Sequence, residues 1–423
     1  MNHFEYRNGE MFAEEVPLKR IAQEVGTPAY VYSLATLKRH FQVFDQAFAK
    51  VPHIVCFSVK ANSNVALLRV FAKQGSGFDI VSGGELFRAL KAGGDPKKIV
   101  FSGVGKKKQE IEYALDAGIL MFNVESDEEL MALNEIAAGA GKKAPISLRV
   151  NPDVDPQTHP YISTGMKKAK FGVDIKRSLE TYKKAMALRH IDVVGVDCHI
   201  GSQLTSVAPF VDALAKVREY LDRVLAGEMK KEGAQIRYLD LGGGLGINYH
   251  DETPPLPHDY AKAIIDGLQG VDITLILEPG RVIVGNAGIL LTEVQYIKET
   301  DTKKFVIVDA GMNDLIRPAL YGSYQAIQPV MESKAEKIVA DVVGPICESG
   351  DFLAKDREIA RPRRNDLLAV MSAGAYGFTM ASNYNSHPKP PEVLVDGDRY
   401  HIVRKRETLE DLINGEVIPA SLQ

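Results

Sequence analysis

The sequence is poor in cysteine, in long apolar runs and in excess charge of one sign. Its three cysteines, Cys56, Cys198 and Cys347, are too few and too scattered for a disulfide framework or a thiolate metal site. No stretch approaches the roughly 18 apolar residues that cross a bilayer, and the first residues lack the pattern of a signal peptide. We therefore expect a cytoplasmic protein without a membrane partner.

The charges are nearly balanced, with 51 Lys and Arg against 55 Asp and Glu, which gives a net charge of −4. Nucleic acid is therefore not an expected partner. A chain of 423 residues that is 45% hydrophobic and 25% charged is ordinary globular protein. Its length predicts two domains, or one large barrel with an appended unit.

Short apolar runs alternate with amphipathic segments through the first two thirds of the chain. Between the runs lie helical patterns such as NVALLRVFAKQG and KQEIEYALDAG, which end in glycine. Eight such units predict an α/β fold, a (β/α)8 barrel over residues 36–283, with a doubly wound open sheet as the alternative. The predicted strands are 53–59, 77–81, 98–102, 119–124, 145–150, 193–199, 237–241 and 273–278.

After residue 284 the pattern changes to alternating runs such as GILLTEVQYIKE and VLVDGDRYHIV. Residues 284–423 are predicted to form a mostly antiparallel β domain, joined by residues 1–35 with the strand PAYVYS. Between the fifth and sixth barrel strands, residues 151–172 carry turn formers instead of a helical stripe. Such an insertion is a common place for binding groups.

Polar residues follow the predicted barrel strands, at the rim where α/β barrels place their reactive groups. Lys60 follows an apolar strand, so a desolvated amine there could form a Schiff base. Glycines at 242, 243, 244 and 246 follow the seventh strand and could form an anion-binding nest. Taken singly, a solvated lysine and a tight turn without a ligand are the ordinary interpretations of these features. The residues after the strands are Lys60, Asp79, Ser102, Asn123, Arg149, His199, Gly242 to Gly244, Glu278 and Arg281.

Three further polar groups suit a flat, charged ligand. Glu278 could hold a protonated heteroaromatic nitrogen, and Arg281 could clamp a carboxylate or phosphate. His199 could stack on a planar ring while Ser202 donates to a phosphate oxygen. The ordinary alternatives are a strand-end salt bridge and a satisfied core histidine.

In the β domain, glycines flank several groups that could approach a ligand. For Cys347 alone, a buried and inert thiol is the ordinary interpretation. The histidines show no HExxH or paired spacing, so no catalytic metal is expected. The groups concerned are Arg317, Tyr321, Cys347, Glu348 and Tyr376.

The barrel groups together suit pyridoxal 5′-phosphate. Its aldehyde would meet Lys60, its phosphate the glycine nest, and its ring the side chains of Glu278 and His199, so that the ring serves as an electron sink.

At these residues the chain resembles the fold-type III, alanine racemase-like pyridoxal phosphate enzymes, and within them the diaminopimelate decarboxylase family. The resemblance covers nearly the whole chain, in segments FSVKAN, GFDIVSGGEL, NPDVDPQTHPYISTGMKKAKFG, HIGSQL, LDLGGGLG, EPGR, DAGMNDLIRPALYGSY, GPICESGDFLAKDR and GAYGFTMASNYNSHP.

The resemblance implies decarboxylation of meso-diaminopimelate to L-lysine and carbon dioxide, and a Greek-key type of β domain. It also implies a homodimer in which Cys347 and Glu348 reach the partner's site, with Lys60, Cys347 and His199 catalytic. The implied cofactor contacts are Lys60, Asp79, His199, Ser202, Gly243, Gly244, Glu278, Pro279, Gly280, Arg281 and Tyr376. The implied substrate contacts are Arg281, Arg317, Tyr321, Glu348 and Tyr376.

Two alternatives stay open. One is a decarboxylase of the same fold that acts on ornithine, lysine, arginine or carboxynorspermidine. The other is a relative that binds the cofactor without catalysis. The intact segments NDLIRPALYG and ICESGDFLAKDR argue against the first, and Lys60 with Cys347 argues against the second.

Overall fold

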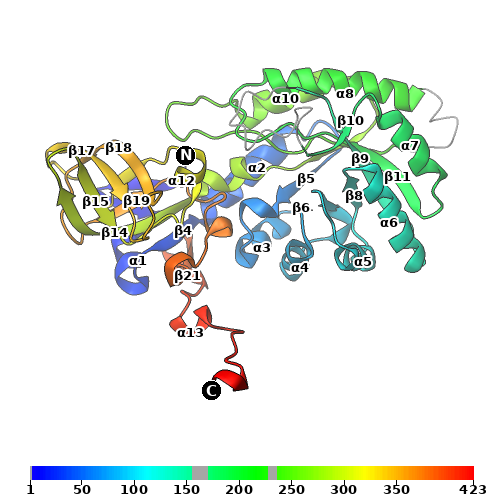
Figure 1. Ribbon diagram of the computed structural model, residues 1–423. Helices are drawn as coiled ribbons and strands as arrows, with labels where there is room; N and C mark the ends of the chain where they lie inside the picture. Colours follow the sequence, from blue (N-terminus) through cyan, green and yellow to red (C-terminus); the bar gives the residue numbers. More distant parts are fainter. Residues whose placement is uncertain (1, 155–169, 227–235) are drawn as a thin grey trace. The chain divides into compact units, whose positions relative to one another are not determined.

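The computed structural model describes residues 2–154, 170–226 and 236–423 (Figure 1). The chain divides into two compact units. One is Lys38–Ile283, and the other combines Met1–Leu37 with Val284–Gln423.

The first unit is a closed parallel barrel of eight strands. Neighbouring strands pair in the order β5, β6, β7, β8, β9, β11, β12, β13, and β13 pairs again with β5. The pairing leaves no edge, so the predicted (β/α)8 barrel is confirmed and the open doubly wound sheet is wrong. The strands are β5 (His53–Ser58), β6 (Gly77–Ile80), β7 (Ile99–Phe101), β8 (Met121–Val124), β9 (Ala144–Asn151), β11 (Ile191–Asp197), β12 (Tyr238–Asp240) and β13 (Thr274–Leu277).

One short strand extends this sheet. β10 (Val173–Asp174) pairs in parallel with the end of β9, through Val150 and Asn151. It directly follows the predicted insertion 151–172, of which residues 155–169 lie outside the described residues.

A helix follows each barrel strand, and the sequence marks where several of them begin. The side chains of Asn64, Ser82 and Ser126 each accept a hydrogen bond from a backbone N–H of the first turn. Gly118 ends α5 in the left-handed conformation. The helices are α2 (Leu34–Ala47), α3 (Val65–Lys73), α4 (Gly83–Lys91), α5 (Lys108–Ala117), α6 (Asp127–Gly139), α7 (Ser178–Ala187), α8 (Ala208–Ala226), α10 (Pro257–Gly267) and α11 (Arg281–Val284).

The second unit is built of sheets that are mostly antiparallel, as predicted. Its main sheet has the order β18-β17-β15-β14-β4-β20-β21, and β19 links β14 to β16. Only the pairs β15–β17 and β4–β20 of this described sheet are parallel. Its strands are β4 (Ala29–Ser33), β14 (Gly288–Glu299), β15 (Lys304–Val308), β16 (Ile327–Pro329), β17 (Lys337–Val343), β18 (Phe352–Ala360), β19 (Leu367–Val370), β20 (Glu392–Asp396) and β21 (Arg399–Arg404).

A small antiparallel sheet, β1 (Phe4–Arg7), β2 (Glu10–Ala13) and β3 (Val16–Pro17), shares a buried core with the main sheet. Met11, Ile21, Val31, Ile289 and Val393 lie in this core. The unit also contains the short helices α1 (Leu18–Val25), α12 (Arg317–Tyr321) and α13 (Leu409–Leu412). Throughout the part of the chain that the structure describes, the helices are too short or too polar to cross a bilayer.

Candidate active site

Lys60 lies where the first barrel strand ends, in the single helical turn Val59–Ala61. Its ammonium group donates to Oδ2 of Asp79, a fully buried carboxylate at the end of β6. Ser58 Oγ donates to the same oxygen over 2.9 Å. Oδ1 of Asp79 is buried and accepts no hydrogen bond from the described residues. This corner therefore holds an amine against an acid that has acceptor capacity left for a ligand.

Glu278, at the end of β13, belongs to a buried network of side chains from five barrel strands. Ser102 Oγ lies 3.1 Å from Glu278 Oε1, and Asn123 Nδ2 donates to Ser102 Oγ over 3.0 Å. The same Asn123 nitrogen lies 3.1 Å from Asp240 Oδ2, and Ser147 Oγ donates to Asn123 Oδ1 over 2.6 Å. The amide nitrogen of Asn123 therefore lies within hydrogen-bond distance of both Asp240 and Glu278.

Burial controls the protonation of these carboxyl groups. Burial raises the pKa of Glu278 well above its usual range, and the neighbouring Asp240 and Asp79 raise it further. Burial also raises the pKa of Asp240 to about 6, although hydrogen bonds from the Gly242 N–H and from Asn123 lower it. A cation placed at Glu278 would offset this cost, which suits a protonated ring nitrogen.

One buried arginine lies among these acids. Arg149 Nη1 pairs with Glu125 Oε1 at 2.8 Å, and its Nε lies 3.8 Å from Asp197 Oδ2. Burial raises the pKa of Asp197, and the Asp240 carboxylate adds to this while Arg149 opposes it. The barrel end thus holds more carboxyl groups than its cations neutralise.

In the glycine run after β12, neighbouring atoms leave no room for a side chain. Gly242 has φ +63°, and a Cβ there would lie 2.2 Å from His199 Nδ1. A Cβ on Gly243 would lie 2.3 Å from the carbonyl oxygen of Glu278, and Gly244 has φ +112°. Only glycine fits such positions, and the bare backbone leaves N–H groups available to a close ligand.

His199 is held against this run, since the Gly243 N–H donates to its Nδ1 over 3.1 Å. Burial lowers the pKa of His199 well below 6.5, and Arg149 and Lys60 lower it further. The imidazole is therefore neutral near pH 7. A neutral ring is sufficient for stacking on a planar group.

Arg281 begins α11 directly after Glu278, Pro279 and Gly280. Its Nη1 donates to the hydroxyl of Tyr249 over 2.7 Å, and its Nη2 donates to Ser202 Oγ over 3.0 Å. The Pro279 carbonyl accepts a 3.1 Å hydrogen bond from Ser58 N, and that of Gly280 accepts one from Ile283 N. The structure thus gathers every predicted barrel residue at the carboxyl ends of the strands.

Five predicted residues lie in the β unit. Arg317 and Tyr321 bound α12, and Cys347 and Glu348 lie between β17 and β18. The carboxylate of Asp351 joins the loop before α12 to the loop that carries Cys347. Its Oδ1 accepts from Met312 N and its Oδ2 from Ile346 N, each over 2.7 Å.

Cys347 is exposed, so the interpretation as a buried thiol is wrong. Its backbone N–H donates to Asn385 Oδ1 over 2.7 Å, which ties the loop to the segment that follows Tyr376. Tyr376 itself has φ +56°, a conformation that a bulky residue rarely adopts and that often marks a functional position.

The sequence assigns no predicted role to Asn123. It also does not identify the hydrogen-bond partners of Asn123 and Arg281 in the barrel, which are Asp240 and Tyr249. Asp240 ends β12 two residues before Gly242, so its position at a strand end could have identified it. Tyr249 holds Arg281 from 32 residues away, and no local pattern announces this contact.

The donor set fits pyridoxal phosphate: a lysine amine beside an acid, a buried acid for a ring nitrogen, and a glycine backbone that admits a phosphate. Among residues 2–154, 170–226 and 236–423, no three His, Cys, Asp or Glu side chains gather in a way that could hold a metal ion.

The comparisons agree with this class of site. Residues 34–285 match the family described as pyridoxal-dependent decarboxylase, pyridoxal binding domain. The chain belongs to the pyridoxal-dependent decarboxylases, which confirms the family predicted from its motifs.

Within that family the chain is similar to diaminopimelate decarboxylases over its whole length. That of Pseudomonas aeruginosa is 57% identical over 98% of this chain and 99% of its own. A solved diaminopimelate decarboxylase of M. jannaschii in complex with L-lysine is 40% identical, covers 100% of this chain and 99% of its own, and has a TM-score of 0.94. A lysine/ornithine decarboxylase of Vibrio vulnificus, 19% identical with a TM-score of 0.78 over 90% of this chain and 97% of its own, shares the fold.

Proposed function

We propose that this chain decarboxylates meso-2,6-diaminopimelate to L-lysine and carbon dioxide, the last step of lysine biosynthesis, with pyridoxal 5′-phosphate as cofactor. The observation that carries the proposal is the 57% identity to a diaminopimelate decarboxylase across both units, since four of the five predicted substrate contacts lie in the β unit and the fifth, Arg281, lies in the barrel. The lysine/ornithine decarboxylase shares only the architecture at 19% identity. The alternative substrates therefore have weaker support.

The barrel residues would hold the cofactor in a defined orientation. Lys60 would bind its aldehyde carbon, Gly243, Gly244 and Ser202 its phosphate, and Glu278 its ring nitrogen. When bound, pyridoxal phosphate supplies an electron sink for the bond that breaks. The remaining expected contacts are Asp79, His199, Pro279, Gly280, Arg281 and Tyr376.

The protein's own groups then control charge and protons. Asp79, which accepts a hydrogen bond from Ser58, fixes the Lys60 amine, so the position of the amine is set before substrate arrives. Ser102 and Asn123 fix the carboxyl group of Glu278, so that it could pair with a ring nitrogen without reorganisation. His199 is neutral and adds no charge beside the ring.

The β unit, together with Arg281 of the barrel unit, would recognise the substrate, and the β unit would return a proton. Arg281, Arg317 and Tyr321 offer donors to carboxylate oxygens, and Glu348 offers an acceptor to an ammonium group. Tyr376 is expected at both cofactor and substrate. The exposed Cys347 thiol would deliver the proton that replaces the lost carboxylate.

We further propose that the enzyme is a cytoplasmic homodimer in which each site combines the barrel of one copy with Cys347 and Glu348 of the other. Both residues are exposed on a loop of the isolated chain, as residues that enter a partner's site must be.

The substrate assignment is tested by measuring carbon dioxide release from meso-diaminopimelate, L-lysine and L-ornithine in separate incubations. We expect release from diaminopimelate alone, because lysine and ornithine leave the arginines without a second carboxylate. Release from ornithine but not from diaminopimelate would overturn the assignment.

The role of Lys60 is tested by Lys60→Ala, with the exposed Lys73→Ala as matched control. We expect the first variant to lose activity and the absorbance of the lysine-bound cofactor, and the second to keep both. A Lys60→Ala enzyme with the parent rate would contradict covalent catalysis through this amine.

A further inference from the structure

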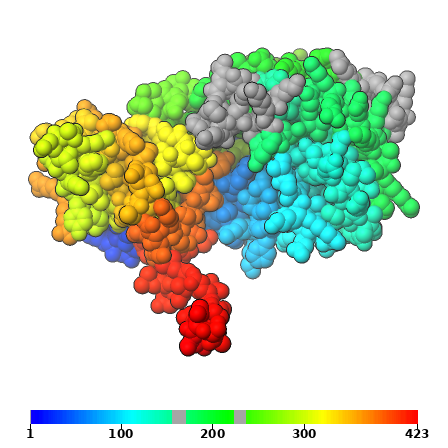
Figure 2. Space-filling view, in the orientation of Figure 1, coloured from blue at the N-terminus to red at the C-terminus, as the bar shows by residue number. Residues whose placement is uncertain are grey.

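The last sixteen residues of the chain form an arm with uncovered apolar side chains. Figure 1 shows this segment, coloured red, extending away from the sheets of the β unit, and Figure 2 shows the same projection with all atoms drawn. Five large apolar side chains along it are 61% to 85% exposed: Leu409, Ile413, Val417, Ile418 and Leu422. Single exposed apolar residues are normal, but a run of five in one segment indicates a contact surface.

The arm nevertheless begins with a defined structure. The Thr408 side chain accepts from the Asp411 N–H, and the Asp411 carboxylate accepts from the Thr408 N–H. These two hydrogen bonds form a capping box at the N-terminus of the helix α13. A segment shaped in this way loses less entropy when it binds than a disordered tail does.

The arm is acidic as well as apolar. Residues 408–423 contain Glu410, Asp411 and Glu416 and no lysine or arginine. Asp411 is engaged in the helix cap, whereas Glu410 and Glu416 form no ion pair with any described residue. A surface that receives the arm must therefore combine apolar floor with free cations.

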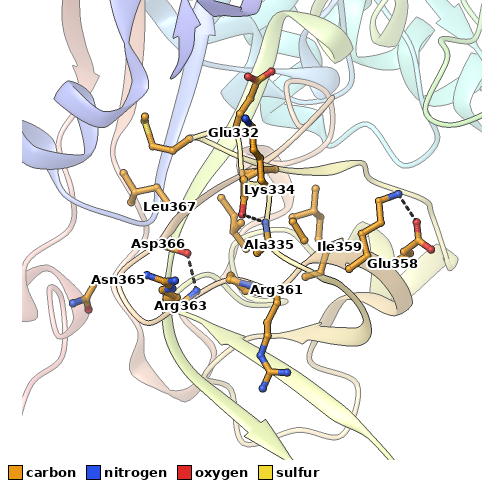
Figure 3. Close-up of a pocket in the computed structure, with 18 of the residues that line it drawn as sticks. Glu332, Lys334, Ala335, Glu358, Ile359, Arg361, Arg363, Asn365, Asp366 and Leu367 are labelled. Atoms are coloured by element: carbon orange, nitrogen blue, oxygen red, sulfur yellow. Dashed lines mark hydrogen bonds and ion pairs between the residues drawn. The ribbon is translucent and has the colours of Figure 1, made fainter. Parts of the chain in front are cut away.

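A cavity of about 690 Å³ in the β unit has this combination (Figure 3). Its walls come from β16, the ends of β17 and β18, and the start of β19. Ile327, Ile359, Leu367 and Leu368 supply apolar surface. The volume is that of a site for a ligand or a few side chains, not of a packing defect.

The charged rim of the cavity is cationic, with five Lys and Arg side chains against the acids Glu332, Glu358 and Asp366. Lys337 pairs with Glu358 at 2.7 Å, and Arg361 pairs with Glu299. Asp366 accepts from the backbone N–H of Arg363 over 2.7 Å. The other three cations, Lys19, Lys334 and Arg363, form no ion pair within the described part of the chain.

We propose that the arm of one copy docks into this cavity of a second copy, with Glu410 and Glu416 facing the free cations and the apolar side chains on the floor. The acidic and apolar side chains of the arm complement the cationic rim and apolar floor of the cavity, which is why we assign the arm as its occupant. Both features belong to the β unit, so the exchange is reciprocal between two copies, as in an isologous interface.

The root of the arm and the cavity lie near the same short helix, α1. Arg406 Nη2 donates to the Pro28 carbonyl just beyond its end, and Lys19 of its first turn lines the cavity. Eight helical residues span about 12 Å, so the two contacts lie toward opposite ends of one short element.

The first test is the mass of the full chain by sedimentation equilibrium, compared with a variant that ends at Glu407 and with Ile413→Asp and Val417→Asp. We expect each change to raise the dissociation constant of the dimer by about tenfold or more, because it removes apolar contact or buries a charge. Equal dissociation constants for the parent and the variants would overturn the proposal.

The second test separates the cavity from any other surface of the partner. Lys334→Glu and Glu416→Lys should each weaken association, and the two together should restore it, while Lys298→Glu, exposed outside the cavity, should have no effect. If the pair is no better than the single variants, the arm does not bind this cavity.

The third test distinguishes a second copy from the same chain. A mixture of ¹⁴N- and ¹⁵N-labelled protein is treated with a carbodiimide that joins amines to carboxylates. Mixed-isotope Lys334–Glu416 peptides support the proposal, and peptides of one isotope only would overturn it. These readouts do not depend on activity, so they stand apart from the proposed reaction.

Discussion

The backbone N–H of Gly243 donates to Nδ1 of His199 over 3.1 Å. This contact uses the lone pair of Nδ1, so the proton of the neutral ring lies on Nε2. The glycine loop thus sets both the orientation and the tautomer of the imidazole.

We expect His199 to be neutral at pH 6.5, where a free histidine is half protonated, because burial, Arg149 and Lys60 all lower its pKa well below 6.5. The measurement is ¹⁵N NMR of histidine-labelled protein, with His199→Gln to assign the signals. Nδ1 should keep the shift of an unprotonated acceptor at this pH. A titration midpoint near that of free histidine, about 6.5, would contradict the structure.

Gly242→Ala should destabilise the protein much more than Gly270→Ala. Both glycines have positive φ, +63° and +78°, so both variants lose about 1 kcal/mol to backbone strain. Only at Gly242 does the new Cβ meet another atom, His199 Nδ1 at 2.2 Å, which adds about 1–3 kcal/mol. The free energies of unfolding in urea give the comparison. Equal losses would mean that the loop moves aside at little cost.

The sequence predicted the barrel because its strands carry a strong local signal. β5 and β9 are short apolar runs, and Asn64 and Ser126 are recognisable helix caps. β10 was not predicted, since two residues that pair only with the end of β9 leave no pattern.

The sequence could predict which residues lie at strand ends, but not the contacts between residues on different strands of the barrel. Glu278 and Lys60 follow strands, so their position indicated their place. The contact between Asn123 and Asp240 joins residues 117 positions apart and depends on closure of the barrel. Exposure of Cys347 likewise depends on how its loop leaves the sheet, which composition does not reveal.

Asp240→Asn should change how stability varies with pH. The carboxyl has a pKa of about 6 in the folded protein against 3.8 as the ordinary value, so the folded state binds the proton more tightly. Its contribution to stability is therefore complete below about pH 4 and is lost as the pH rises through 6.

The asparagine variant lacks this loss. Relative to the parent, its free energy of unfolding should rise by on the order of 2 kcal/mol between pH 4 and pH 7 in urea titrations. Asp272→Asn, an exposed carboxyl on the same unit, serves as control and should follow the parent curve. A constant difference between Asp240→Asn and the parent would show that the carboxyl ionises normally in the fold.

Lys60→Ala and Cys347→Ala should each be inactive alone and active when mixed, if each site combines the barrel of one copy with the loop of the other. In a mixed dimer one site then carries both changes and the other carries neither. Half the dimers of an equal mixture are mixed, so activity should recover to about a quarter of the parent value. The variants are unfolded together, refolded with cofactor and assayed for carbon dioxide release, and each variant refolded alone is the control. No recovery, with mixed dimers present by mass spectrometry, would place Cys347 in the site of its own chain or outside any site.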